Sequence, residues 1–154
     1  MNNEKKAIFY QLKSPVRDLC VCHFAEMYYE QGKKVFIIVD TEGRAESLDR
    51  VLWTFKQSSF IPHEIIDELS ADIEVPVVIS ALTAKNYEAD ILIVAKNVLD
   101  ESEAFLTSFD QVIDFADQTD ESSTLQSRER YRVLKDAGFT MEYFDKLPFS
   151  IKSY

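Results

Sequence analysis

Few residues in this chain have side chains suited to covalent catalysis. It contains two histidines, His23 and His63, and two cysteines, Cys20 and Cys22. Neither histidine has a serine or cysteine nucleophile at a recognisable spacing, and no Gly-x-Ser-x-Gly elbow occurs. A metal site would need a cluster of cysteines, histidines and carboxylates, and the carboxylates are scattered. We therefore expect no catalytic residue, no metal and no cofactor.

The histidines and cysteines have simpler interpretations. His23 falls on the apolar side of a helical stretch, which is typical of a packed, hydrogen-bonded core histidine. His63 follows a proline in an irregular stretch and is expected at a surface or an interface. Cys20 and Cys22 point about 200° apart on a helix. They are therefore expected to be small hydrophobic residues in a reducing compartment, not a disulfide or a chelating pair.

A stripe of basic and aromatic residues gives the clearest binding signal. Residues three, four and seven apart share one face of a helix, and this face carries Arg128, Tyr131, Arg132 and Lys135. In a chain with 27 acidic and 17 basic residues, such a stripe suits a short acidic peptide with an aromatic residue or a terminal carboxylate. Arginine can hold a carboxylate through two parallel hydrogen bonds. Spacing alone leaves a solvated helix face as an equal alternative. Arg130 points elsewhere and is expected to pair with an acid.

A second group of aromatic residues lies in the first half of the chain. Trp53, the only tryptophan, ends a helical stretch, and Phe60, Pro62 and His63 follow in a loop. Large rigid aromatic residues on irregular segments commonly anchor interfaces. On composition alone, the favoured alternative is that Trp53 and Phe60 simply cover the core.

Alternating strands and helices must position these residues. Apolar runs predict strands at 7–12, 35–39, 75–79, 90–95 and 111–115, and helical periodicity predicts helices at 16–31, 44–54, 100–107 and 122–137. The segment 55–70 is expected to be irregular, and about 140–154 to be a C-terminal extension. The pattern predicts one α/β domain over 1–154 with a Rossmann-like, doubly wound, largely parallel sheet and helices on both faces.

Charge and glycine content narrow the function. A net charge of −10 disfavours strong direct binding to DNA, because it repels phosphate backbones. The loop after the first strand, 12–15, has no glycine, whereas dinucleotide folds need glycines there. A small nucleotide-binding α/β enzyme therefore remains only an alternative. No apolar run approaches the roughly 20 residues of a membrane span, and no signal peptide is recognisable, so we expect a cytoplasmic location.

Several motifs, in their order along the chain, resemble the chi subunit family of bacterial DNA polymerase III. The match covers nearly the whole chain, and its most specific parts are Leu-Trp followed by Ser-Phe-Ile-Pro-His, and Arg-Glu-Arg-Tyr-Arg. The motifs are Phe9-Tyr10-Gln11-Leu12, Leu48…Leu52-Trp53, Ser59-Phe60-Ile61-Pro62-His63, Asp90-Ile91-Leu92-Ile93, Val112-Ile113-Asp114-Phe115, Arg128-Glu129-Arg130-Tyr131-Arg132 and Ala137-Gly138-Phe139.

The resemblance implies a non-catalytic accessory subunit. In that family the subunit links the clamp loader, through the psi subunit, to the acidic C-terminal tail of single-stranded-DNA-binding protein. The tail-binding role would fall on Arg128, Tyr131, Arg132 and Lys135. The role of facing psi, or another clamp-loader component, would fall on Trp53, Phe60, Pro62 and His63. An interaction module with a different partner is the other alternative.

One acidic residue departs from the family pattern. Asp117 follows the last expected strand, where a neighbour of the tail's aromatic residue should be apolar or neutral. We expect Asp117 to weaken the binding of an acidic tail or to alter its pose.

Overall fold

Continuous apolar runs form the centre of a parallel sheet. The computed structural model describes residues 4–56, 60–67 and 74–151. Every residue of β2 (Val35–Val39) and β5 (Ile91–Ala95) is buried. Strands covered by helices on both faces need apolar side chains in both directions, and these two strands lie side by side in the middle of the sheet.

Within the described residues, the sheet contains seven parallel strands. Their order across the sheet is β3 (His63–Ile66), β4 (Val77–Ser80), β2, β5, β6 (Gln111–Asp117), β1 (Lys6–Leu12) and β7 (Thr140–Phe144). The expected strands appear as β2, β5, β1 (Lys6–Leu12), β4 (Val77–Ser80) and β6 (Gln111–Asp117). Two further strands were not predicted. One is β3 (His63–Ile66), inside the segment expected to be irregular, and the other is β7 (Thr140–Phe144), inside the expected extension. Both are edge strands, and their partial exposure removes the apolar run that marks a central strand.

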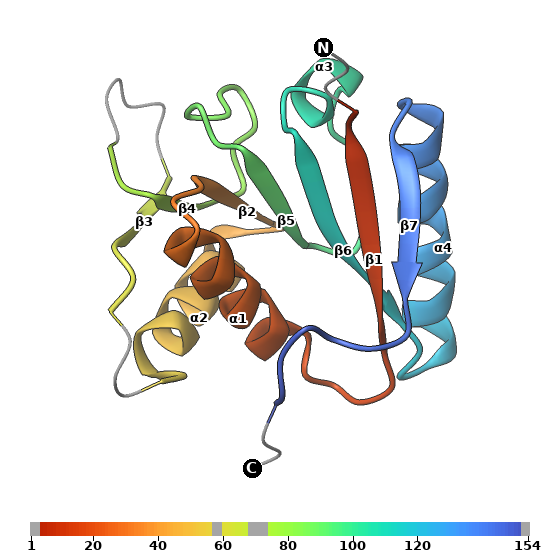
Figure 1. Ribbon diagram of the computed structural model, residues 1–154, viewed down its shortest axis with the longest axis horizontal. Helices are drawn as coiled ribbons and strands as arrows, with labels where there is room; N and C mark the ends of the chain where they lie inside the picture. The colour runs from red at the N-terminus through yellow and green to blue at the C-terminus, as the bar shows by residue number, and fades with distance from the viewer. Residues whose placement is uncertain (1–3, 57–59, 68–73, 152–154) are drawn as a thin grey trace.

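In the part of the chain that the structure describes, four helices cover the two faces of the sheet, which confirms the doubly wound α/β fold (Figure 1). They are α1 (Arg17–Glu30), α2 (Glu42–Thr54), α3 (Glu103–Leu106) and α4 (Glu121–Asp136). Side-chain oxygens of Thr41 and Asp120 accept backbone hydrogen bonds at the starts of α2 and α4. Gly32 follows α1 with a φ of 78°, a left-handed conformation that favours glycine.

Each face of the sheet has its own hydrophobic core. On β1, Ile8 and Tyr10 pack with α1 and α2, whereas Ala7 and Phe9 pack with α3 and α4. The alternation follows from the two-residue period of a strand. As a result β1 and β6, which are neighbours in the sheet, present side chains to both cores.

The chain after β7 returns across the α1 side of the sheet (Figure 1). Leu147, Phe149 and Ile151 pack on that core. The Phe149 ring stacks on His23 with centroids 4.8 Å apart, and His23 also meets Phe55 at 5.1 Å. His23 is therefore packed among aromatic rings, as predicted, but it is half-buried at the edge of the core and not a core residue.

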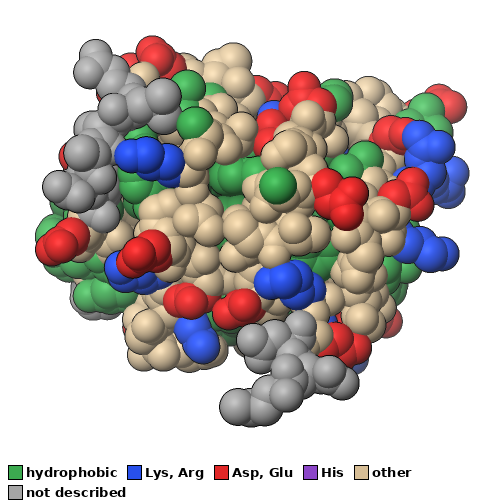
Figure 2. Space-filling view, turned by 90° about the horizontal axis from the view of Figure 1, so that it is seen from above, with side chains coloured by type: hydrophobic (Ala, Val, Ile, Leu, Met, Phe, Trp, Pro, Cys, Tyr) green, Lys and Arg blue, Asp and Glu red, His purple; other side chains and the backbone are tan. Residues whose placement is uncertain are grey.

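Charged side chains of both signs are interspersed over the face of the molecule that Figure 2 shows. Figure 2 views the molecule from the end at which β1 begins, and Lys and Arg side chains gather at its right-hand side, where Figure 1 shows α4 and β7. None of the helices within the described ranges is long and apolar enough to cross a membrane.

Candidate functional site

The basic stripe lies on α4 as its spacing predicted. Arg128, Arg132 and Lys135 are exposed, and Tyr131 is half-buried beside the core. The Tyr131 ring meets Phe9 of β1 edge-on, with centroids 5.2 Å apart. The aromatic member of the stripe is thus fixed in place, while its three cations extend toward solvent.

A groove with a volume of about 270 Å³ opens beside Tyr131. It lies between α4, the end of β6 and the strand β7, and its exposed lining is mostly apolar. The lining residues are Phe9, Ala116, Asp117, Gln118, Thr124, Ser127, Arg128, Tyr131 and Tyr143. A groove of this kind accepts an aromatic or aliphatic side chain, and Arg128 places a cation at its rim.

The three cations differ in their surroundings. Arg132 forms an ion pair with Glu129 one turn earlier on α4, and both side chains are more than half exposed. Such exposed pairs contribute little and exchange readily for another anion. Within the described part of the chain, Arg128 and Lys135 have no ion-pair partner. Arg128 is therefore the cation best placed to meet an anionic group of a ligand in the groove.

Asp117 lines the same groove, so the acidic residue that departs from the family pattern does lie beside the stripe. Its Oδ1 accepts hydrogen bonds from the backbone N–H and hydroxyl of Thr119, at 3.0 and 2.6 Å. Its own backbone N–H donates to Ser127 Oγ at 3.0 Å. The carboxylate is held by these bonds and brings negative charge to the groove wall.

Arg130, in the middle of the same motif, is buried. It pairs with an acid as predicted: its Nε donates to both carboxylate oxygens of Asp114, at 3.1 and 3.0 Å. Its other nitrogens donate to the carbonyls of Asn97 and Phe115 and to Ser127 Oγ. Arg130 therefore joins α4 to β6 and takes no part in the exposed stripe.

The carboxyl ends of β1 and β6 meet at the point where doubly wound folds commonly bind ligands. Here the two ends are joined, because the N–H of Gln118 donates to the carbonyl of Leu12 at 2.8 Å. Arg17, at the start of α1, donates to the carbonyls of Val94 and Lys96 at 3.2 and 2.8 Å. Its guanidinium also lies 3.7 Å from Asp114, so Arg17 connects the end of β5 to β6.

The structure also gathers the second group of aromatic residues. The centroid of the Trp53 ring lies 5.4 Å from that of Phe60 and 4.7 Å from that of His63. Trp53 and Phe60 are 49% and 66% exposed, so they do not cover the core, and that alternative is wrong. Ser58 and Ser59, also part of this stretch, lie outside the described residues.

His63 organises this aromatic group from beneath. Its side chain is only 1% exposed, which corrects the expectation of a surface residue. Its Nε2 lies 2.9 Å from Asp49 Oδ1, and its Nδ1 lies 2.7 Å from the carbonyl of Ile61. Pro62, between Ile61 and His63 in the sequence, is half-buried. These contacts hold the loop against α2. The Trp53 ring packs on His63, and Phe60 packs on Trp53.

The two surfaces are separate. Figure 1 shows α2, which carries Trp53, and α4, which carries Tyr131, toward opposite sides of the molecule. They pack on different cores, one on each face of the sheet. Neither surface therefore covers the other.

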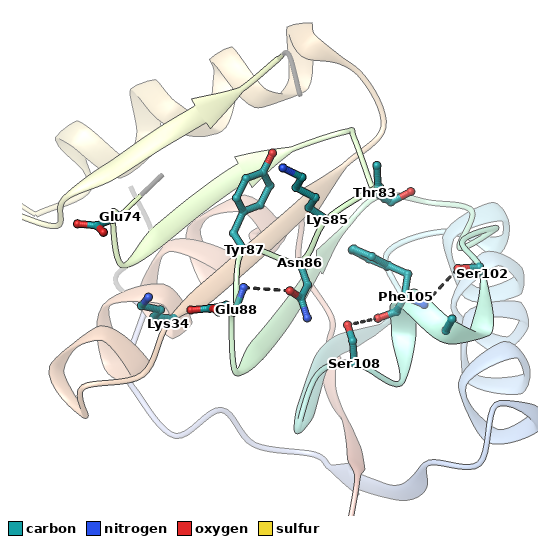
Figure 3. A pocket seen from close by; sticks show the side chains of 12 residues that line it. Lys34, Glu74, Thr83, Lys85, Asn86, Tyr87, Glu88, Ser102, Phe105 and Ser108 are labelled. Carbon is teal, nitrogen blue, oxygen red and sulfur yellow. Dashed lines mark hydrogen bonds between the residues drawn. The ribbon is translucent and has the colours of Figure 1, made fainter. Parts of the chain in front are cut away.

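A larger polar cavity of about 930 Å³ lies at the ends where the strands begin (Figure 3). Lys34, Lys85 and Glu88 give it mixed charge, and Phe105 of α3 points into it. Asn86 Oδ1 accepts the backbone N–H of Glu88 at 2.9 Å in its wall. None of the residues predicted to form a site lines this cavity.

The thiols lie in the core, as predicted. Cys20 and Cys22 are free and fully buried. Burial raises the pKa of Cys20 to about 12, and it raises the pKa of Cys22 as well. The residues that the structure describes include no group of three or more His, Cys, Asp or Glu side chains able to hold a metal ion.

Sequence reasoning missed several residues of the groove. Phe9, Thr124, Ser127 and Tyr143 line it but come from three different elements. The sequence pattern around Phe9 indicates only a core residue of a strand, and Tyr143 lies in a strand that was not predicted. Only the pairing of β1 with β7, which sets Phe9 beside Tyr143, reveals that they belong together.

Comparison with known proteins gives consistent results. A family model described as "DNA polymerase III chi subunit, HolC" matches residues 5–142. The DNA polymerase III subunit chi of Haemophilus influenzae is 33% identical over 120 residues, which cover 78% of this chain and 81% of that protein. The Escherichia coli subunit chi is 32% identical over 148 residues, covering 89% and 95%. The Pseudomonas aeruginosa subunit chi is 28% identical over 122 residues, covering 79% and 80%.

Proposed function

The chain belongs to the DNA polymerase III chi subunit family, and we propose from this premise that it is a non-catalytic accessory subunit of the replicative holoenzyme. It links the clamp loader to single-stranded-DNA-binding protein by capturing the acidic C-terminal tail of that protein. The observation that supports this role is the apolar groove beside Tyr131. Arg128, which has no ion-pair partner among the described residues, lies at its rim.

The groove has the chemistry that an acidic tail with an aromatic residue requires. The ring of the tail would lie against Tyr131 over Phe9, where burial of aromatic area is favourable. Arg128 would hold a carboxylate through two parallel hydrogen bonds. Arg132 and Lys135 extend the positive charge along α4 and attract the remaining acids of the tail.

Asp117 opposes this binding through its charge. It lies in the groove wall, and its carboxylate repels the acids of the tail at short range. Its hydrogen bonds to Thr119 also hold the loop before α4. Asp117→Asn keeps an oxygen for these bonds and removes the charge, so it should strengthen tail binding.

The aromatic group at Trp53 would face the psi subunit or another clamp-loader component. Trp53 and Phe60 leave large apolar areas exposed side by side, which suits an interface anchor. His63 and Pro62 shape this surface from below, since His63 is bonded to both Asp49 and Ile61. This aromatic group lies on α2, on the other face of the sheet from α4, so a partner bound there would leave the α4 groove free for the tail.

Titration of a fluorescently labelled tail peptide tests the first contact. Arg128→Ala and Tyr131→Ala should each weaken binding by about fivefold or more, the effect of truncating a residue worth above ~1 kcal/mol. Arg50→Ala is the matched control, because Arg50 is an exposed arginine on α2 and its loss changes net charge equally. Affinity that is unchanged by both α4 substitutions would exclude tail capture at this groove.

Two further measurements separate the alternatives. Affinity capture from the native cell with Trp53→Ala beside the unmodified protein should show loss of the clamp-loader component and retention of single-stranded-DNA-binding protein. A thermal-shift screen against nucleotides should show no stabilisation, whereas a binder at 100 times its Kd adds about 2.7 kcal/mol. Stabilisation by a nucleotide would favour the enzyme alternative, and capture of unrelated proteins would favour a different interaction module.

A further inference from the structure

Two neighbouring aromatic residues on β7 have opposite orientations. Tyr143 lines the groove on the α4 side of the sheet. Phe144 lies on the other side, where its ring stacks on Tyr10 with centroids 5.5 Å apart. Their side chains are similarly exposed, at 49% and 45%. Successive residues of a strand alternate between faces, so this edge strand presents one aromatic ring to each face.

Tyr143 completes the groove as a second aromatic wall. It pairs in register with Phe9 of β1, which is 1% exposed and forms the floor. Tyr131 of α4 lines the same groove and contacts the same floor residue. A ring that enters the groove therefore meets Tyr131 and Tyr143 from two elements, with Phe9 beneath it.

The half-exposed ring of Tyr143 does not belong to either hydrophobic core. It lies one residue beyond the end of the family match at 142, so the match does not cover it. We propose that Tyr143 is a specificity-determining residue of the groove, which makes this protein prefer a peptide whose terminal side chain is aromatic over one whose terminal side chain is aliphatic. The proposal rests on the proposed function, since it concerns the same groove and the same acidic peptide.

Ring-to-ring contact supplies the preference. Aromatic pairs in edge-on or offset geometry gain about 0.5–1.5 kcal/mol beyond the burial of area, which corresponds to roughly two- to tenfold in affinity. An aliphatic side chain gains only the area term. Loss of the Tyr143 ring should therefore weaken the binding of the aromatic peptide more than that of the aliphatic peptide, and so lower the ratio of the two affinities.

The test compares two labelled acidic peptides that are identical except for a terminal phenylalanine or leucine. Tyr143→Leu keeps an apolar side chain and removes the ring, and Tyr143→Phe keeps the ring and removes the hydroxyl. Phe144→Leu is the matched control on the opposite face. We expect Tyr143→Leu to lower the phenylalanine-to-leucine affinity ratio by roughly two- to tenfold, and the other two variants to leave it unchanged.

The outcomes distinguish this inference from the function on which it rests. If Arg128→Ala weakens both peptides and Tyr143→Leu leaves the ratio unchanged, the tail site stands and the specificity role of Tyr143 is wrong. If neither Arg128→Ala nor Tyr131→Ala alters the binding of either peptide, the proposed function itself fails. A ratio lowered equally by Phe144→Leu would also overturn the assignment, because it would point to a general effect on β7. Thermal unfolding of each variant confirms that the compared proteins are folded.

Discussion

Replacing Arg130 with methionine separates the buried arginine of α4 from the exposed ones. Arg130 is 2% exposed and Asp114 is 0% exposed. The guanidinium bonds both carboxylate oxygens at 3.1 and 3.0 Å, and it also donates to two backbone carbonyls. Arg130→Met removes all these bonds and leaves the carboxylate of Asp114 buried without its main partner.

The expected loss of stability is about 3 kcal/mol. Breaking a buried ion pair by removing one partner costs roughly 3–5 kcal/mol, because the remaining charge is uncompensated. Arg17 lies 3.7 Å from Asp114 and retains part of the compensation, which places the loss at the lower end. For a domain of this size, about 3 kcal/mol corresponds to a fall in Tm of roughly 6–12 °C.

Urea unfolding and calorimetry measure this loss. Arg128→Met is the control, since it is an exposed arginine on the same helix and should stay within about 0.5 kcal/mol of the parent protein. The double variant Asp114→Asn, Arg130→Met should lose less than the sum of the two single losses, because it leaves no unpaired carboxylate. A loss below ~1 kcal/mol for Arg130→Met, or strict additivity in the double variant, would refute the structural role of the pair.

Three further predictions concern the α1 side of the sheet. Cys20, fully buried with its pKa raised to about 12, should react with a thiol reagent at pH 8 only after denaturation. Phe149→Ala should cost about 1–2 kcal/mol in urea unfolding, because this half-buried ring stacks on His23 and meets Phe24 edge-on at 4.8 Å. Burial lowers the pKa of His23, so the unfolded chain binds that proton more tightly and the free energy of unfolding falls as pH drops below about 6.5. His23→Gln should therefore lose less stability than the parent protein between pH 7.5 and 5.5.

Different results would contradict each of these predictions. Rapid modification of the native protein would show that the helix opens around Cys20. A loss for Phe149→Ala no larger than that of Leu125→Ala, a control residue 57% exposed on α4, would show that the chain after β7 adds no stability. Identical pH slopes for His23→Gln and the parent protein would show that His23 does not contribute to the pH dependence.

The central elements were predictable because burial leaves a local pattern. β2 and β5 are buried along their whole length, and their apolar runs predict strands without further information. β3 and β7 were not predictable, because edge strands are half exposed and contain Glu64 and Glu142 among their residues. Their strand state depends on pairing with β4 and β1, which no local pattern reveals.

The sequence by itself determined the α/β class and the basic stripe with Arg128, Tyr131 and Arg132 on one helix face, since both follow from local spacing. It also indicated the family, through the resemblance of its motifs and their order along the chain. Only the tertiary structure decided what that stripe lines. In the folded protein Arg130 is buried against Asp114, Asp117 lies in the wall of the groove, and Tyr143 lines the same groove as Tyr131. Residues from β1, β6 and β7 meet at this groove only because the sheet pairs strands that are distant in the chain, and side-chain spacing along one helix carries no information about such pairing.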